Sequence, residues 1–315
     1  MRVINLVDET KTDIKYKISQ FPDGQQNITL KAYKFNDIWI ATQLHQLSEE
    51  PVKIISHLNN FLDLEIIIAT VACLRELDVE KIHLVTPYFV GARSDRKFED
   101  GGNWYLKDVI CPIINSLKFA SVLILDPHSW VLGNLITKFK YISNEDLVKW
   151  AIYNIYPDNE KRTTDHSYCK LVSPDAGASH KIEKLAKSLD FKGDIITCSK
   201  ERDTEGNLTK TVVPLPYQVN NGDYLAYRAK DFIIIDDICD GGRTFINIAK
   251  ELRNNGVTGK IYLIVTHGIF SAGFEELNEN FDGIFCTDSY STVGDYASFY
   301  GKLIKTNVTQ LKVYE

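Results

Sequence analysis

The strongest chemical signal in the sequence is the segment Phe232–Phe245, which reads FIIIDDICDGGRTF. An apolar run leads into two adjacent carboxylates, and a glycine-containing loop then leads into a helical pattern. In parallel sheets, ligands bind beyond the carboxyl ends of the strands, where loop amides and a helix N-terminus attract phosphate. The glycines permit close backbone approach, whereas the carboxylates repel phosphate and suit ribose hydroxyls or a hydrated Mg²⁺. The predicted sugar-phosphate-binding residues are Asp236, Asp237, Asp240, Gly241, Gly242, Arg243 and Thr244, the last of which can also cap the helix.

A strand that ends in a capped turn, with its acids merely solvated, is the alternative interpretation of this segment. The apolar run before the acids and the helical pattern after them favour a binding site, because a strand, a loop and a helix in this order form a phosphate cradle. The segment resembles the loop that binds phosphoribosyl pyrophosphate (PRPP) in type I phosphoribosyltransferase folds.

Short apolar runs alternate with longer helical patterns along the chain, which is typical of parallel sheets covered by helices. Leu62–Leu77 and Thr244–Asn255 have helical spacing, and Gly256 stands where a helix C-cap glycine belongs. Each half of the chain has its own alternation, so we expect an α/β protein with two domains, residues 1–143 and 144–315. The candidate strands are Ile38–Thr42, Lys81–Pro87, Ser121–Leu125, Lys170–Ser173, Asp194–Cys198, Asp231–Ile235 and Lys260–Thr266.

Two polar stretches interrupt this alternation. Asn144–His166 is interpreted as a connection between domains or a surface excursion, and the domain boundary is expected before or within it. Lys200–Gly222 is too charged to pack and long enough for a mobile active-site loop, and a solvated hairpin is its alternative interpretation.

The composition of the 315-residue chain, 25% charged and 44% hydrophobic, is typical of a soluble globular protein. No apolar stretch approaches the roughly 18 residues that span a bilayer, and the first residues lack the apolar core of a signal peptide. We therefore expect a cytoplasmic protein without a membrane partner. The 6 cysteines have no CxxC spacing, and the net charge of -6 offers no broad attraction for nucleic acid.

Five segments resemble, in the same order, those of the ribose-phosphate pyrophosphokinases, the PRPP synthetases. They are FPDGQQNI (Phe21–Ile28), PYFVGARSDRKF (Pro87–Phe98), LILDPHS (Leu123–Ser129), VSPDAGA (Val172–Ala178) and THGIFSAG (Thr266–Gly273). This resemblance implies two type I phosphoribosyltransferase-like domains related by a pseudo-twofold axis. It also implies transfer of the β,γ-diphosphoryl group of Mg·ATP to the C1 hydroxyl of ribose 5-phosphate, which yields AMP and a 1-pyrophosphate. Such a displacement depends on positioning and charge neutralisation.

The resemblance also assigns roles to individual residues. It assigns magnesium to His128 and Asp175, and catalysis to His128 together with Lys200 and Arg202 of a flexible loop. The residues that it assigns to ATP are Phe21, Asp23, Gln25, Arg93, Ser94, Asp95 and Arg96. By themselves, these residues have simpler interpretations: a tight turn at Phe21–Ile28, a basic surface turn at Pro87–Phe98, a hydrogen-bonded core histidine and surface charges.

The sequence departs from the family pattern where the sugar phosphate is expected to bind. Gly241 stands where the family has a threonine, Arg243 stands where it has a glycine, and Gln25 replaces an acidic residue. The first two changes suit a substrate with an extended 5-phosphate, such as ADP-ribose, which a related phage-associated group pyrophosphorylates. Both ribose 5-phosphate and ADP-ribose therefore stay open as acceptors.

Two other functions are compatible with the fold that the resemblance implies. One is a phosphoribosyltransferase that consumes PRPP, and the other is a catalytically inactive regulatory protein. The retained ATP-type segments argue against the first, and the retained His128, Asp175, Lys200 and Arg202 argue against the second. The family also leads us to expect a homo-oligomer, a dimer at least.

Overall fold

The computed structural model describes residues 1–36, 38–41, 44–157, 168–202, 208–215, 224–293, 296–299, 302–305 and 308–314. The chain divides into two compact units, Met1–Ser143 with Val313–Glu315, and Asn144–Lys312. We call them the N-terminal unit and the C-terminal unit. Residues 313–315 were predicted to belong to the second domain, but this end of the chain groups with the first unit.

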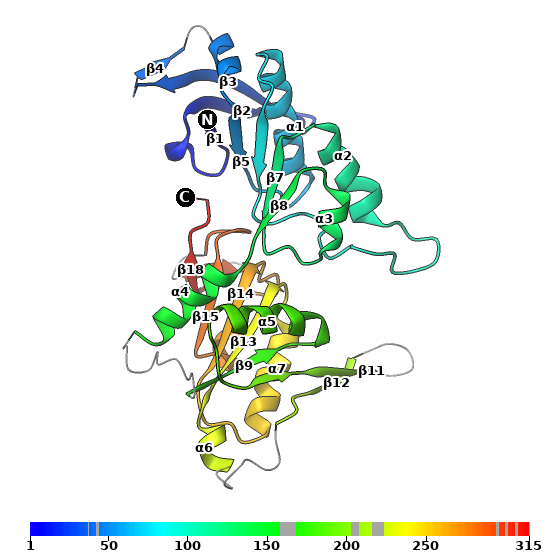
Figure 1. The fold of residues 1–315 in the computed structure, drawn as a ribbon, viewed down its shortest axis with the longest axis vertical. Helices are drawn as coiled ribbons and strands as arrows, with labels where there is room; N and C mark the ends of the chain where they lie inside the picture. The colour runs from blue at the N-terminus through cyan, green and yellow to red at the C-terminus, as the bar shows by residue number, and fades with distance from the viewer. Residues whose placement is uncertain are drawn as a thin grey trace. The chain divides into compact units, whose positions relative to one another are not determined.

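The N-terminal unit contains a parallel sheet whose strand order is β1-β5-β6-β7-β8 (Figure 1). Its strands are β1 (Arg2–Asn5), β5 (Val52–Ile55), β6 (Ile82–Val85), β7 (Ser121–Leu125) and β8 (Phe139–Ile142). The helices are α1 (Phe61–Glu76), α2 (Cys111–Ser116), α3 (Val131–Leu135), the 3-10 helices Glu9–Lys11 and Leu44–Glu49, and a π-helical turn at Leu106–Ile110. At the start of α1, Asn60 and Asp63 form a capping box, which pairs backbone N–H groups that the helix leaves unbonded.

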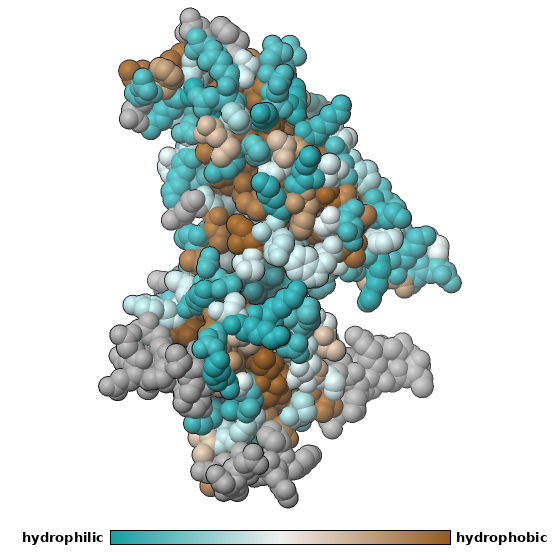
Figure 2. Space-filling view, viewed as in Figure 1, coloured by the Kyte–Doolittle hydropathy of each residue, from teal (hydrophilic) through white to brown (hydrophobic). Residues whose placement is uncertain are grey.

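A small antiparallel sheet accompanies the parallel one and shares its core. It consists of β2 (Ile14–Gln20), β3 (Gln26–Phe35) and β4 (Ile38–Ile40). In β3, Ile28 and Leu30 are buried while Thr29 and Lys31 are exposed, which is the alternation of a strand with one face on the core. We had counted Ile38–Thr42 among the strands of parallel sheets, and its placement in β4 corrects that prediction. The hydrophobic patch at the upper left of Figure 2 lies over β4 and the end of β3.

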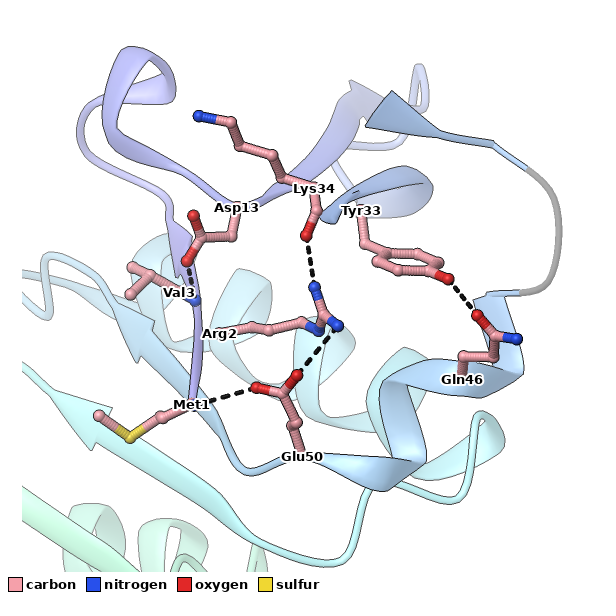
Figure 3. Close-up of polar contacts among 8 residues, drawn as sticks. All are labelled: Met1, Arg2, Val3, Asp13, Tyr33, Lys34, Gln46 and Glu50. Carbon is pink, nitrogen blue, oxygen red and sulfur yellow. Dashed lines mark hydrogen bonds and ion pairs between the residues drawn. The ribbon is translucent and has the colours of Figure 1, made fainter. Parts of the chain in front are cut away.

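Polar contacts join the first strand to the antiparallel sheet (Figure 3). The Arg2 guanidinium donates to the Lys34 carbonyl and, at 3.0 Å, to the Glu50 carboxylate, and it lies over the Tyr33 ring. The N-terminal amine also contacts Glu50 at 3.0 Å. These contacts hold β3 against β1, and β2 and β3 in turn carry the turn that contains Phe21.

The C-terminal unit contains a parallel sheet whose strand order is β10-β9-β13-β14-β15-β18. Its strands are β9 (Cys169–Ser173), β10 (Ile195–Thr197), β13 (Asp231–Cys239), β14 (Ile261–Gly268), β15 (Gly283–Thr287) and β18 (Val308–Leu311). Its helices are α4 (Glu145–Ile155), α5 (Ala176–Ser188), α6 (Tyr224–Arg228), α7 (Arg243–Asn254) and α8 (Glu275–Asn280). Two antiparallel pairs complete the described part: β11 (Ser199–Arg202) with β12 (Leu208–Val212), and β16 (Tyr296–Phe299) with β17 (Lys302–Lys305).

The two faces of this sheet have separate cores. Ile233 and Ile235 of β13 pack in the cluster that contains α4 and α5, whereas Phe232 and Ile234 pack in the cluster that contains α7. Successive side chains of a strand point to opposite faces, so both faces of β13 are apolar from Phe232 to Ile235, and this part of its sequence is a continuous hydrophobic run.

The predicted fold class is confirmed, because parallel sheets flanked by helices form both units. Each predicted strand appears, and both predicted helices appear as α1 and α7. The proposed connection Asn144–His166 was wrong in its first part, since Glu145–Ile155 forms helix α4 with buried apolar residues. Residues 158–167 lie outside the described residues. In the polar stretch after Lys200, β11 and β12 pair as the hairpin that we considered as the alternative.

Within the described ranges, no helix is both long and apolar enough to cross a membrane. All 6 cysteines are free, and 5 of them are buried. Burial raises the pKa of Cys111, Cys169 and Cys286 to about 12, so these thiols stay protonated and unreactive at neutral pH.

Candidate functional site

Three of the predicted segments meet at one edge of the C-terminal unit's sheet. β13 lies between β9 and β14, and all three strands are parallel, so their carboxyl ends lie side by side. Asp175 follows β9, the acidic pair lies in the second half of β13, and Thr266–Gly273 begins within β14. The structure therefore brings together VSPDAGA, the acidic loop and THGIFSAG.

The loop after β13 is held by the turn that follows β14. The Ser271 hydroxyl donates to the Asp240 carboxylate at 2.5 Å, and the Ser271 amide donates to the Asp240 carbonyl at 3.2 Å. The amides of Ile269 and Phe270 both donate to the carbonyl of Cys239. These bonds fix the backbone from which α7 begins, and they give Ser271 a role in the loop's structure.

Gly242 is the residue from which helix α7 begins. Its φ is +78°, in the left-handed region that favours glycine, and a Cβ at this position would lie 2.9 Å from Cδ2 of Leu277. We predicted that Thr244 could cap this helix, but the helix begins at Arg243 and Gly242 supplies no side-chain bond. The first amides of α7 therefore have no side-chain cap, and Thr244 lies inside the first turn.

Replacing Gly242 with alanine is expected to destabilise the protein by about 1–3 kcal/mol, because the new Cβ meets Leu277 and the backbone is left-handed. Gly241→Ala is the matched control. Its Cβ would lie 3.6 Å from Cβ of Ala272, an ordinary contact, so the free energy of unfolding should change by at most about 0.5 kcal/mol. Urea unfolding of both variants measures the difference, and equal losses would contradict the role given to Gly242.

The acidic pair of β13 lies among other charges. The Lys181 ammonium of α5 contacts the Asp237 carboxylate at 2.7 Å, and the Asp237 amide donates to the Asp236 carboxylate at 2.9 Å. Burial raises the pKa of Asp236 well above its usual value, the charges of Asp237 and Asp175 raise it further, and the charge of Lys181 lowers it. Asp236 is therefore a carboxyl whose negative charge is disfavoured until a cation or a hydroxyl donor arrives.

Asp175 caps helix α5. Its Oδ1 accepts hydrogen bonds from the amides of Gly177 and Ala178 at 3.0 and 3.2 Å, and the Ser173 hydroxyl donates to its carbonyl at 2.7 Å. A single carboxylate thus fixes the start of α5 and places negative charge near Asp236. Its predicted role as a magnesium ligand stays a prediction.

The Thr266–His267 pair forms part of the buried base of this edge. His267 is buried, and its Nδ1 is 2.7 Å from the Ser289 hydroxyl, while the Thr287 hydroxyl donates to the Thr266 carbonyl at 2.6 Å. These bonds join the ends of β14 and β15. The THGIFSAG segment is therefore anchored to β15 at its start, and its later residues hold the loop after β13 by hydrogen bonds.

In the N-terminal unit, the predicted ATP residues of Pro87–Phe98 follow β6, and His128 follows β7. β6 and β7 are neighbouring parallel strands, so both segments begin at one sheet edge. Arg93, Arg96 and His128 are exposed, and the Arg96 guanidinium lies 5.9 Å from the centre of the Phe98 ring. The exposure of His128 removes the alternative of a core histidine.

Three further residues that are predicted to bind ATP lie at the tip of the β2–β3 hairpin: Phe21, Asp23 and Gln25. Phe21 and Gln25 close this turn, because the Phe21 amide donates to the Gln25 carbonyl at 2.9 Å, and Asp23 accepts from the Gln25 amide at 3.2 Å. The Gln26 amide donates to Glu65 of α1 at 3.1 Å. All three side chains are exposed, as a tight turn requires, and their contact with ATP stays a prediction.

Lys200 and Arg202 belong to β11, whose backbone pairs with β12. The intervening residues 203–207 and both predicted catalytic side chains lie outside what the structure describes. Their role in catalysis stays a prediction.

Comparison with known proteins relates this arrangement to a family. Residues 142–290 match the family model of the phosphoribosyl transferase domain, the part of the chain that holds the acidic pair and the glycine loop. Ribose-phosphate pyrophosphokinase 2 of Saccharomyces cerevisiae is 29% identical over 283 residues, which cover 87% of this chain and 78% of the yeast chain. The ribose-phosphate pyrophosphokinase of Mycoplasmopsis pulmonis is 27% identical over 306 residues, which cover 95% of this chain and 85% of the other.

This chain is a divergent relative of the ribose-phosphate pyrophosphokinases. The crystal structure of phosphoribosylpyrophosphate synthetase from Mycobacterium smegmatis matches with a TM-score of 0.71 at 16% identity, and the match covers 96% of this chain and 87% of that one. At this identity the structural match shows a shared fold.

For a ribose-phosphate pyrophosphokinase relative, the donor set suits magnesium that arrives with phosphates. Among the described residues, no group of three or more His, Cys, Asp or Glu side chains could hold a metal ion. Mg²⁺ commonly binds through one or two carboxylates, waters and substrate phosphates, so a dedicated cluster is not required. Asp175 supplies a carboxylate in the C-terminal unit, and His128 lies in the N-terminal unit.

Lys181, the basic residue of the acidic cluster, was not among the predicted site residues. The spacing of apolar residues in α5 could have identified it. Lys181 lies three residues after Ala178 and four before Leu185, both of which are buried, so it falls on the buried face of an amphipathic helix. A lysine on such a face requires a partner, because a buried charge is costly without one.

Proposed function

We propose that this protein transfers the β,γ-diphosphoryl group of Mg·ATP to the anomeric hydroxyl of a ribose 5-phosphate unit, and so acts as a pyrophosphokinase. The observation that carries the proposal is the single sheet edge that gathers Asp175, the Asp236–Asp237 pair and the glycine loop before α7. The similarity of the chain to ribose-phosphate pyrophosphokinases supports the same reaction.

In the proposed reaction, the C1 hydroxyl oxygen attacks the β-phosphorus of ATP. The bond between the β-phosphorus and the oxygen bridging to the α-phosphorus breaks, and its electron pair leaves with AMP. The hydroxyl proton passes to water. The products are AMP and a 1-pyrophosphate, and the protein contributes positioning and charge neutralisation rather than a covalent intermediate.

Each group of predicted residues has a place in this reaction. The first amides of α7 and the Thr244 hydroxyl hold the 5-phosphate, while Asp236 and Asp237 accept hydrogen bonds from ribose hydroxyls. Asp175 in the C-terminal unit and His128 in the N-terminal unit would each be able to hold magnesium, which would supply positive charge for the triphosphate. The exposed guanidinium groups of the Pro87–Phe98 segment bind the triphosphate of ATP, and Lys200 and Arg202 act on the diphosphoryl group in the transition state.

The acceptor depends on Gly241 and Arg243. Arg243 is exposed and is the first residue of α7, where a positive side chain opposes the helix dipole by about 0.3–1 kcal/mol. An anion bound at this end offsets that repulsion. The diphosphate of ADP-ribose spreads its two negative charges over a longer group than a single 5-phosphate does, so an added arginine beside the loop can contact the second phosphate. This residue therefore supports ADP-ribose as an acceptor beside ribose 5-phosphate.

The decisive test is incubation with Mg·ATP and, separately, ribose 5-phosphate or ADP-ribose, followed by AMP detection and mass spectrometry. A diphosphoryl mass gain on ribose 5-phosphate alone would identify a PRPP synthetase, and a gain on ADP-ribose alone would identify an ADP-ribose pyrophosphokinase. If neither acceptor gains mass, the activity proposed here is wrong, and the inactive regulatory protein becomes the better interpretation. Release of pyrophosphate from PRPP with a base acceptor would favour a phosphoribosyltransferase.

The double variant Gly241→Thr with Arg243→Gly tests the acceptor. It restores the family's residues, and the Cβ at position 241 meets only ordinary contacts. We expect the ratio of kcat/KM for ADP-ribose to that for ribose 5-phosphate to fall about tenfold, because one charged contact is worth about 1.5–3 kcal/mol. Competition between the two acceptors in one reaction measures this ratio, and an unchanged ratio would rule out the extended-phosphate hypothesis.

A further inference from the structure

Helix α5 brings two groups of opposite charge to the acidic cluster of the C-terminal unit. Its N-cap, Asp175, contributes a carboxylate, and Lys181 extends from the second turn to Asp237 of β13. Ile233 and Ile235 pack on the α4 and α5 side of the sheet, and Asp237 continues this alternation. The sheet therefore turns Asp237 toward α5 and the ammonium of Lys181.

The contact between Lys181 and Asp237 differs from a surface ion pair. The two charged atoms are 2.7 Å apart, and the side chains are 24% and 6% exposed. Removing one partner of a buried pair leaves an uncompensated charge, whereas an exposed pair contributes little. The acidic groups that remain in this cluster would include Asp175, Asp236 and Asp237, whose charges have the same sign.

We propose that Lys181 is a positioning residue, which holds the Asp237 carboxylate in the orientation that accepts ribose hydroxyls and compensates the charge of the acidic pair. This inference rests on the function proposed above, since it assigns the ribose to this sheet edge. Lys181 acts through Asp237 and is not assigned a contact with the substrate.

The helix itself does not depend on Lys181. Asp175 caps the first turn of α5, and Ile182, Leu185 and Ala186 pack in the apolar cluster with β13. The geometry of α5 is therefore set by its cap and its apolar face. We therefore assign the role of Lys181 to its contact with the Asp237 carboxylate and not to the stability of the helix.

The test is calorimetric binding of ribose 5-phosphate, and separately of ADP-ribose, with Mg²⁺ and without ATP. Lys181→Met is expected to weaken binding about tenfold or more, and Lys181→Arg should retain affinity within about threefold because it keeps the charge. Lys187→Met, an exposed position of the same helix, is the matched control and should bind like the natural protein.

A double-mutant cycle separates positioning from a general structural role. If Lys181 acts through Asp237, the variant Lys181→Met with Asp237→Asn should bind ribose 5-phosphate within about twofold of Asp237→Asn alone. This double variant leaves no uncompensated charge at the pair. Its binding can therefore still be measured if Lys181→Met by itself does not fold. The proposal would be overturned if Lys181→Met bound ribose 5-phosphate as tightly as the natural protein, or if Lys181→Arg bound as weakly as Lys181→Met. It would also be overturned if the losses of affinity from Lys181→Met and Asp237→Asn multiplied in the double variant.

The binding readout also separates this proposal from the proposed activity. If the protein binds ribose 5-phosphate but forms no AMP from ATP, the proposed reaction fails, and Lys181 is still judged by the cycle. If the natural protein binds neither probe, the ribose assignment of this edge is wrong and the role of Lys181 is overturned with it.

Discussion

Asp175→Asn is expected to lower turnover about 100-fold or more while leaving the protein nearly as stable as the natural chain. Asparagine caps helices about as well as aspartate, so its side-chain oxygen can still accept from the amides of Gly177 and Ala178. Asparagine lacks the negative charge with which Asp175 is proposed to bind magnesium. Steady-state kinetics at saturating Mg·ATP, together with urea unfolding, measure the two effects separately.

Asp175→Ala is the control for this prediction. It removes both the charge and the cap, so it should lose turnover like the asparagine variant and also lose about 1 kcal/mol of stability. Full activity in Asp175→Asn would show that the charge is not needed. An asparagine variant as unstable as the alanine variant would contradict the capping role.

The second large effect is expected for Asp236→Asn, which should stabilise the free protein and abolish its binding of ribose 5-phosphate. The pKa of Asp236 is raised in the folded state, chiefly by burial. The neutral carboxyl therefore favours the folded state fully below the unfolded pKa of about 3.8, and this contribution is lost as the pH rises through the folded pKa. Asparagine stays neutral and keeps the contribution at every pH.

Thermal unfolding without magnesium at several pH values checks this expectation. At pH 8 the variant should melt roughly 2–4 °C higher, which corresponds to about 1 kcal/mol for a unit of this size. As the pH falls below the unfolded pKa of about 3.8, the difference should shrink toward zero, because the natural residue becomes neutral in both states. A variant that is less stable at pH 8, or a gain that does not depend on pH, would contradict a raised pKa of Asp236 in the folded protein.

The strand, loop and helix around Asp236–Thr244 could be predicted because each is encoded by consecutive residues. The apolar run of β13, the glycines and the amphipathic pattern of α7 are local features, and the structure contains them in that order. The strands β1 and β5 were missed, although β6, which has the same length of four residues, was predicted.

The faces of β13 could not be predicted from its sequence. The strand is buried on both sides, so no alternation of polar and apolar residues shows where Asp236 and Asp237 point. For the same reason the partner of Asp237 was missed, although Lys181 lies on the buried face of its own helix. The two residues are 56 positions apart, and their contact depends on β9 being the neighbour of β13.

The sequence by itself determined the α/β class, the two helices with the clearest periodicity and the residues of the acidic loop, because these properties arise from interactions between near neighbours in the chain. The tertiary structure decided which loops share an edge, that Gly242 rather than Thr244 precedes α7, and that Lys181 faces the acidic pair. Strand order and helix packing are set by burial of apolar surface across distant segments, and no local pattern encodes them.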